Sequence, residues 1–456
     1  MSVSGATALS QLTEIVGEAN IVRDPRQLTR YDIDSKTPSA AVRPAAEAEV
    51  ADIVKFAGRE KLACVVSGAQ TKLGIGMPPR RYDLALDLSR LDRIIAYDPE
   101  DLTLSAEAGT PLSKIASVLA EHDQFIPLTV PFMARATIGG TIVSGVDSPL
   151  RHSYGTARDF VLGMNFVTGD GIAAKSGGRV VKNVSGYDIH KMLIGSLGTL
   201  GAITRINFRT FPLPRQTRTF VAEFRGSREA CEFRNAIVGS VLRPRTLEIV
   251  SESARGQLLP AEKARAAFGD NRWSVYVAFA GDEDVLKRNY KELEAARHSE
   301  DRVSEWLREL NPVDEQSVMS IVSEFPAAIL KRFPAAAILK ISALGAELPD
   351  LASYTASIEM PWAVVMRGLG VAYLALWPPD GSEGSLHVLK QHCRRIFALA
   401  GKPPFRHVTL PWCPSALKRD IDIWGPLPAS FELMKKLKNV FDPGGILSPG
   451  RFMGGI

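Results

Sequence analysis

The sequence has 456 residues, 45% of them hydrophobic and 23% charged, with a formal net charge of +5. This length favours two or three domains, because single hydrophobic cores stop growing at roughly 250–300 residues. The weak and unclustered positive charge argues against a nucleic-acid-binding protein, whose surface would be far more basic. No run of about eighteen apolar residues exists, so the sequence predicts no transmembrane segment.

The cysteines are spaced as isolated thiols rather than as a ligand set. They are Cys64, Cys231, Cys393 and Cys413. No pair has CxxC spacing, and nothing resembles the C-x2-C-x2-C run of an iron–sulfur site. We therefore expect reduced thiols and no metal site. The expected location is the cytoplasm, or the periphery of the inner membrane through a complex.

The first half of the chain alternates helix and strand signals. Apolar residues at helical spacing over 50–57 precede a short apolar strand over 62–66 that ends at Ser67 and Gly68. Thr110 and Pro111 predict the start of a helix, with the threonine as N-cap and the proline at the first helical position. Further strands are predicted over 84–88, 102–106, 160–168, 172–174 and 202–211.

The second half begins after Pro212-Leu213-Pro214, where two prolines end a strand and stiffen the link. Predicted strands then alternate with charged helices, which indicates an α+β domain with a mostly antiparallel sheet. The strands span 219–224, 274–279, 337–342 and 371–376. Near the end, an amphipathic helix places Leu433, Leu437, Val440 and Phe441 on one side, and a turn-rich tail follows.

Three glycine-containing stretches could carry chemistry. Residues 65–72 form a strand that stops at Ser67-Gly68, where successive N–H groups can make an anion-binding nest. In residues 136–145, Gly139-Gly140 precede an apolar helical turn, as at a phosphate-binding helix start. Residues 181–188 lead to Gly195-Ser196-Leu197-Gly198. Taken alone, the first and third stretches are more typical of ordinary turns and loops, and the second is equally consistent with a tightly packed helix. No Rossmann or P-loop fingerprint occurs.

Together, in this order, the stretches resemble the FAD-binding domain of the vanillyl-alcohol oxidase and p-cresol methylhydroxylase flavoproteins. Within that family they are most similar to the FAD-binding subunits of bacterial glycolate oxidases. The resemblance runs from about residue 43 to 214 and returns over 441–452. Its most specific pieces are 108–112, 136–145, 158–163, 182–188 and the ending Ser448-Pro449-Gly450-Arg451, with serine in place of the family's usual asparagine.

The resemblance implies an α+β architecture in three segments. Residues 1–214 would form an FAD-binding domain, 215–410 a cap domain for substrate or partner, and 411–456 a return to the FAD-binding domain. It also implies FAD-binding residues. Ser67, Gly68, Ala69, Gln70, Thr71 and Lys72 would wrap the pyrophosphate on one side, and Thr137, Gly139 and Gly140 on the other. Ser144 and Gly145 would lie near the ribityl chain or flavin ring, and the main chain of Ile203 near the adenine.

The mode of attachment also follows from the resemblance. Some family members link the flavin covalently to a histidine in the first loop, where this chain has Gln70. We therefore expect FAD to be bound non-covalently. His152 is the other early candidate for such a link, and we expect it to be a satisfied loop residue rather than a flavin link.

The family resemblance leaves two roles open. In the first, the chain oxidises glycolate or a similar small 2-hydroxy acid and passes electrons through flavin to a partner or acceptor. In the second, it is a flavin-carrying companion that assembles with a catalytic flavoprotein and an iron–sulfur subunit. The histidine–glycine metal motif of the catalytic relatives is missing around His387, His392 and His407, and Leu197 replaces a common acidic residue. The missing motif favours the companion role, and the leucine weakens any transfer of the relatives' catalytic assignments to this chain.

No catalytic base follows from the sequence. Arg151, Arg158 and Arg451 are cations that could fall near the flavin. An ordinary surface or ion-paired arginine is the expectation for each of them.

Overall fold

The computed structural model describes residues 6–180, 186–258, 273–297 and 306–456. The described residues of the first half form two larger sheets and a two-stranded pair. β1 (Ile21–Val22), β2 (Ala40–Val42), β4 (Leu84–Asp87) and β3 (Cys64–Ser67) form the first sheet, in that order. β2, β4 and β3 are parallel, and β1 is antiparallel. Helices α1 (Ala6–Val16) and α3 (Glu47–Arg59) pack with this sheet in one apolar core.

The second sheet is antiparallel and has five strands. Its order is β5 (Ile94–Asp98), β6 (Thr103–Glu107), β10 (Ala202–Arg209), β8 (Val161–Val167) and β9 (Ala173–Gly177). β8 and β9, near the strands predicted over 160–168 and 172–174, form a hairpin, and Gly171 between them has a φ of 80°. Short helices α4 (Leu112–Ala120), α5 (Ile138–Ser144), α6 (Arg151–Tyr154), α7 (Ala157–Phe160) and α8 (His190–Leu193) belong to this half, as does the two-stranded β7 (Gln124–Phe125) and β11 (Phe211–Pro212) pair.

The helix predicted at Thr110 begins slightly later than expected. α4 starts at Leu112 with Pro111 as its N-cap. The Thr110 hydroxyl donates to the Arg93 carbonyl at 3.3 Å instead of capping the helix. The N-cap and first-position assignments were therefore wrong by one residue.

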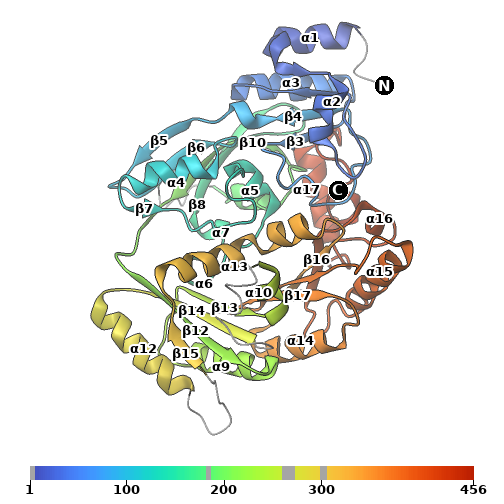
Figure 1. Cartoon of the computed structure of the whole chain (residues 1–456). Coiled ribbons are helices and arrows are strands. Elements are labelled where there is room, and N and C mark those ends of the chain that lie inside the picture. The colour runs from blue at the N-terminus through green and yellow to red at the C-terminus, as the bar shows by residue number, and fades with distance from the viewer. Residues whose placement is uncertain (1–5, 181–185, 259–272, 298–305) are drawn as a thin grey trace.

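The second half is built on one eight-stranded antiparallel sheet, here called the cap sheet (Figure 1). Its order is β15 (Trp306–Glu309), β12 (Thr217–Phe224), β14 (Trp273–Ala280), β13 (Thr246–Val250), β17 (Trp362–Arg367), β18 (Val371–Leu376), β16 (Ala337–Ser342) and β19 (His407–Trp412). The prediction of a mostly antiparallel α+β domain is confirmed. The predicted bounds of β16 and β18 match the structure.

Helices cover both faces of the cap sheet. α9 (Ser227–Gly239), α12 (Glu283–Arg297), α14 (Leu348–Tyr354) and α15 (Glu383–Ala398) pack into one apolar core. α13 (Pro312–Arg332) and α10 (Glu252–Leu258) belong to the other. α13 lies between the cap sheet and the first half of the chain (Figure 1). There the Glu324 carboxylate accepts hydrogen bonds from the N–H groups of Phe132 and Met133 at 2.7 and 2.8 Å.

The C-terminal tail returns to the first sheet. After α16 (Ser415–Lys418), α17 (Phe431–Phe441) leads to a segment that runs beside β3. Cys64 donates to Ile446 and accepts from Ser448 through the main chain, and Cys64 and Leu447 form a parallel bridge. Since β19 extends to Trp412 and the cap core includes Ile423, we propose that the return begins after Ile423 rather than at 411.

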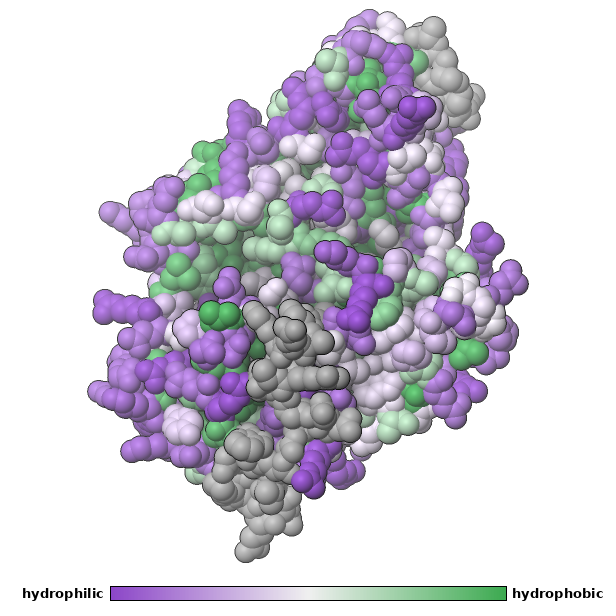
Figure 2. All heavy atoms as spheres, in the orientation of Figure 1, coloured by the Kyte–Doolittle hydropathy of each residue, from purple (hydrophilic) through white to green (hydrophobic). Residues whose placement is uncertain are grey.

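The face of the molecule that is drawn in Figure 2 is mostly hydrophilic. Figure 2 shows hydrophilic residues over much of this face, with a more hydrophobic band at the level where the two halves meet. Within the described residues, no helix is long and apolar enough to cross a membrane.

Candidate functional site

The loop after β3 presents main-chain N–H groups that lack acceptors. β3 ends at Ser67, and the chain turns through Gln70, whose φ is 57°. Among the described residues, the N–H groups of Ala69, Gln70, Thr71 and Lys72 have no hydrogen-bond partner. The Gln70 side chain braces the loop by donating to the Gly68 carbonyl and accepting from Arg30 at 3.3 Å. Successive N–H groups free in a turn suit an anion such as phosphate.

The start of α5 packs directly against this loop. Thr137 is the N-cap, and its hydroxyl accepts a hydrogen bond from the Gly140 N–H at 3.4 Å. A Cβ on Gly68 would lie 2.3 Å from the Thr137 hydroxyl oxygen, and a Cβ on Gly139 would lie 2.7 Å from the Ala108 carbonyl oxygen. Both glycines therefore permit a close approach that a side chain would prevent.

Two adjoining cavities lie between these segments. Ser67, Gly68, Thr137 and Gly140 line both of them. The first is also lined by Ala69, Gln70, Thr71, Lys72, Ser144, Leu197 and Arg451. The second is also lined by Gly139, Ala108, Gly198, Gly201 and Ile203. The fold thus gathers the predicted FAD-binding residues around one site, with the exception of Gly145.

Gly145 ends α5 instead of lining the site. Its φ is 60°, in the left-handed region, and a Cβ there would lie 3.1 Å from the Cα of Gly195. The residue therefore allows the loop after α5 to pass close to the segment 195–201. That segment supplies three site residues that the sequence reasoning did not assign, Leu197, Gly198 and Gly201. The regular spacing of its glycines was the available signal.

Two buried cations belong to the first cavity. Burial lowers the pKa of Lys72 to about 8, with Glu324 opposing the change, and its ammonium lies 5.8 Å from the centre of the Phe132 ring. Arg451 is 3% exposed, and its Nη2 donates to the carbonyls of Leu73 and Ile75. The expectation that Arg451 is an ordinary surface or ion-paired residue was wrong.

Burial also lowers the pKa of Arg451 to about 10, a change that Tyr82 and Asp34 oppose. Its Nη1 is buried and has no partner among the described residues, as is true of the hydroxyl groups of Ser67 and Ser448. Buried polar groups are normally hydrogen-bonded, so unsatisfied donors beside a cavity point to a polar ligand.

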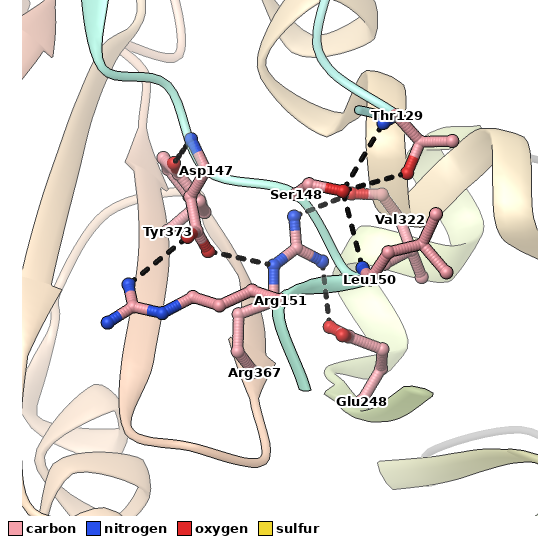
Figure 3. Close-up of polar contacts among 9 residues, drawn as sticks. All are labelled: Thr129, Asp147, Ser148, Leu150, Arg151, Glu248, Val322, Arg367 and Tyr373. Atoms are coloured by element: carbon pink, nitrogen blue, oxygen red, sulfur yellow. Dashed lines mark hydrogen bonds and ion pairs between the residues drawn. The ribbon is translucent and has the colours of Figure 1, made fainter. Parts of the chain in front are cut away.

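A buried charge network joins the loop after α5 to the cap sheet (Figure 3). Arg367 of β17 pairs with Glu248 of β13 at 2.7 Å and with Asp147 at 3.5 Å. Asp147 also pairs with Arg151 at 3.2 Å, and its N–H donates to the Tyr373 hydroxyl oxygen at 3.4 Å. Burial raises the pKa of Glu248 to about 7, although Arg367 opposes that rise. The guanidinium of Arg367 is thus already engaged by two carboxylates.

The other candidates among the described residues lie apart from the cavities. Arg158 is exposed and donates to the Lys191 carbonyl at 2.7 Å. His152 lies on α6, which contacts β13, and its buried Nδ1 has no partner among the described residues, so it is not the satisfied histidine that we expected. Burial lowers its pKa. Lys182 and Asn183 lie outside the described residues, and Tyr187 is 90% exposed.

Among the residues that the structure describes, neither thiols nor histidines gather into a ligand set. All four cysteines are free, and burial raises the pKa of the Cys64 thiol to about 12. His387 lies beside Gln391 on α15, and His407 is on β19. In the described part of the chain, no group of three or more His, Cys, Asp or Glu residues could hold a metal ion.

Two family models match segments of the chain that contribute residues to this site. Residues 38–177 match the FAD binding domain family, and residues 427–452 match the C-terminal domain of FAD linked oxidases. The chain is 31% identical over 229 residues to the glycolate oxidase subunit GlcE of Escherichia coli, an alignment that covers 50% of this chain and 59% of that protein. It is 22% identical over 461 residues to GlcD of Bacillus subtilis, covering 97% and 95% of the two chains.

A third relative is the D-2-hydroxyglutarate dehydrogenase of Xanthomonas citri, with 31% identity over 44% of each chain. Among solved structures, p-cresol methylhydroxylase with substrate bound superposes with a TM-score of 0.77 at 16% identity, covering 98% of this chain and 96% of that one. 4-Ethylphenol oxidase from Gulosibacter chungangensis gives 0.74 at 15% identity, covering 98% and 96%. These structures establish the fold.

Proposed function

This chain is an FAD-linked oxidoreductase with the p-cresol methylhydroxylase fold, and from that premise we propose that it serves the oxidation of a small 2-hydroxy acid. Specifically, it would be the FAD-binding subunit of a glycolate oxidase or dehydrogenase. Relatives named as glycolate oxidase subunits and as a D-2-hydroxyglutarate dehydrogenase support this substrate class. Electrons would pass from the substrate through flavin to a partner or acceptor.

The proposed position of the cofactor depends on one observation. Residues 69–72, whose four N–H groups have no acceptor among the described residues, line a cavity whose opposite wall is the glycine-containing start of α5. We propose that Ser67 to Lys72 bind one side of the FAD pyrophosphate and that Thr137, Gly139 and Gly140 bind the other. Ser144 would lie toward the flavin, and the main chain of Ile203 toward the adenine. The close approach of Gly68 to Thr137 keeps both walls near one ligand.

The chain's own groups would bind and orient the cofactor. Bound flavin supplies the hydride acceptor in such reactions. Lys72 and Arg451 would neutralise phosphate charge, because both cations are buried and line the same cavity. Leu197 takes the position at which many relatives have an acidic residue, and it makes this wall of the cavity apolar. None of the described histidines lines either cavity, so we name no catalytic base.

A second candidate function rests on the network around Arg367. A 2-hydroxy acid needs a cation for its carboxylate, but the Arg367 guanidinium at this junction already binds Glu248 and Asp147. Two internal carboxylates therefore already neutralise this cation, which leaves it poorly suited to bind a substrate carboxylate. This favours a companion subunit that carries FAD and assembles with a catalytic flavoprotein and an iron–sulfur subunit.

FAD would be held without a covalent link. The first-loop position that carries a flavin-linked histidine in some relatives is Gln70 here, and its amide is used within the loop. A carboxamide is also a poor nucleophile. Acid precipitation of the holoprotein should therefore release free FAD into the supernatant.

One experiment separates the two candidate functions. Purified holoprotein is mixed with glycolate, and separately with D-lactate, under anaerobic conditions while the visible flavin bands are recorded. Bleaching by either acid would support a catalytic subunit. Bands that stay unchanged with the chain alone, but bleach once partner subunits are added, would support the companion. Absence of any flavin after reconstitution with FAD would contradict both.

A further inference from the structure

Helix α17 buries one of its charged residues and leaves part of its apolar side exposed. Lys438 is 8% exposed, and its ammonium donates to Asp442 at 2.6 Å and to the carbonyls of Thr199 and Leu447 at 2.7 and 2.9 Å. By contrast, Leu433 is 58% exposed and Val440 is 74% exposed. The apolar stripe predicted from the sequence is present, but these two residues face away from the described chain.

The stripe continues into an apolar groove of about 240 Å³. Met434 and Leu437 of α17 line one side of the groove, and Met192, Ile194 and Leu200 line another. Phe452 and Ile456 of the tail also belong to its lining. Leu437 therefore belongs both to the groove and to the exposed stripe, since it is one turn from Leu433 and Val440. Contiguous apolar surface of this kind marks an interaction site.

The groove and the candidate FAD site share one short segment. Within 195–201, Gly195, Ser196, Thr199 and Leu200 line the groove, whereas Leu197, Gly198 and Gly201 line the two cavities. The Lys438 ammonium fixes this segment through the Thr199 carbonyl. A molecule in the groove would therefore be separated from the FAD cavities by a single stretch of main chain.

The charges around the patch indicate the chemistry of its partner. Two carboxylates close in sequence to the groove residues, Glu432 and Asp188, are already neutralised, because they pair with Lys435 and Lys191, each at 2.6 Å. Lys436 lies on the exposed face between Leu433 and Val440, and Arg80 lies against Gly455 beside Ile456. Neither Lys436 nor Arg80 has a carboxylate partner among the described residues, so the rim is basic and complements an acidic partner.

We propose that this patch, formed by the groove together with Leu433, Lys436 and Val440, docks an amphipathic helix of another protein subunit. That helix would insert aliphatic side chains into the groove and set carboxylates against Lys436 and Arg80. The concave shape suits discrete side chains better than a flat lipid surface. The inference rests on the proposed function, which calls for partner subunits, and it adds where such a subunit binds and by which chemistry.

The test uses the FAD-loaded full chain and two labelled synthetic peptides. Both are helix formers with leucines at i, i+3, i+4 and i+7, flanked in one by glutamates and in the other by lysines. Fluorescence anisotropy at low salt should show binding of the acidic peptide and roughly tenfold or weaker binding of the basic one. Leu437→Glu should weaken binding of the acidic peptide by at least about tenfold, because it places a charge in the groove.

Two further variants keep the test decisive. Lys436→Glu changes a solvent-exposed side chain, so its fold should be preserved, and it should weaken binding of the acidic peptide and strengthen binding of the basic one. Val241→Glu, at a 64% exposed valine elsewhere on the surface, should change neither. Equal binding of both peptides, or no effect of Leu437→Glu and Lys436→Glu, would overturn the proposal.

Two other occupants would also overturn it. Concentration-dependent self-association that Val440→Glu abolishes would assign the patch to a second copy of this chain. Sedimentation with anionic phosphatidylglycerol vesicles that the same variant abolishes would assign it to a lipid surface. The flavin absorbance of each sample separates the proposals: selective peptide binding by a chain that takes up no FAD would support the docking site and contradict the FAD-binding function.

Discussion

Gly68 lies so close to Thr137 that a methyl group on the glycine would stand 2.3 Å from the threonine hydroxyl oxygen. The two residues come from the end of β3 and the start of α5, which belong to segments far apart in the sequence. Their contact brings the loop of residues 69–72 close to the first turn of α5. The site is therefore formed largely by main-chain atoms. The volume of the side chains where these two segments meet should control its geometry.

The Gly68→Ala variant tests that control. The added methyl group would push the Thr137 side chain from its position and cost its hydrogen bond with the Gly140 N–H. We expect FAD affinity to fall at least about tenfold, and the apoprotein to lose about 1 kcal/mol of stability through the weakened cap. Gly178→Ala is the control, because a Cβ there meets nothing within 4 Å. Isothermal titration calorimetry gives the FAD affinity of both variants. Equal FAD affinity of Gly68→Ala and Gly178→Ala would contradict the account.

Arg451 should contribute to FAD binding, because one nitrogen of its buried guanidinium has no hydrogen-bond partner among the described residues. In Arg451→Met, the buried donor to the cavity and the bonds to the Leu73 and Ile75 carbonyls are lost. We expect FAD affinity to fall by about 10- to 100-fold, as for the loss of a charge-assisted hydrogen bond. Arg451→Lys should recover part of that loss, since it keeps the charge without the forked geometry. Equal FAD affinity in the methionine variant would show that Arg451 is structural only.

The network at the junction should matter for stability. Arg367→Met would leave Glu248 and Asp147 buried beside each other without their shared cation. We expect a loss of about 3–5 kcal/mol, as when one partner of a buried ion pair is removed. Tyr373→Phe, which removes one long hydrogen bond, should cost about 1 kcal/mol or less. Chemical denaturation measures both, and an Arg367→Met loss as small as that of Tyr373→Phe would refute the role of the pair.

Glu248 should make stability depend on pH. Its pKa in the folded protein is raised to about 7 by burial, from an ordinary value of 4.5. Between these values the folded protein holds a proton that the unfolded chain has released, so stability should fall as the pH rises from about 4.5 to 7. Above pH 7 this residue adds no further change. The total effect is about 3 kcal/mol at most.

The Glu248→Gln variant isolates this contribution. The amide cannot titrate, so the difference in unfolding free energy between wild type and variant should change between pH 5 and 7 and level off above pH 7. Thermal or chemical unfolding at several pH values gives that difference. A difference that stays constant across the range would show that Glu248 does not titrate there.

The local sequence was sufficient to predict the elements whose own apolar pattern marks where they begin and end. The strands at 337–342 and 371–376 are apolar runs bounded by turn residues, and β16 and β18 begin and end as predicted. The loop after β3 and the start of α5 could also be identified, since small residues at strand and helix ends indicate close main-chain approach. That both belong to one site followed from the family resemblance rather than from either stretch.

Contacts between distant segments could not be read in this way. Arg451 is buried because two carbonyls near residue 74 accept its hydrogen bonds, and nothing near residue 451 encodes that partner. Likewise, the apolar stripe of α17 predicts an amphipathic helix but not which side faces inward. The Lys438–Asp442 pair, with its contacts to Thr199 and Leu447, determines that orientation.

The most direct measurement of the central claim compares FAD with riboflavin as ligands of the wild-type apoprotein. If the N–H groups of residues 69–72 and the start of α5 bind the pyrophosphate, most of the affinity should come from the half that riboflavin lacks. Quenching of flavin fluorescence should then show FAD binding at least about 100-fold more tightly, which corresponds to roughly 3 kcal/mol. Equal binding of the two flavins, or no binding of FAD, would contradict the account.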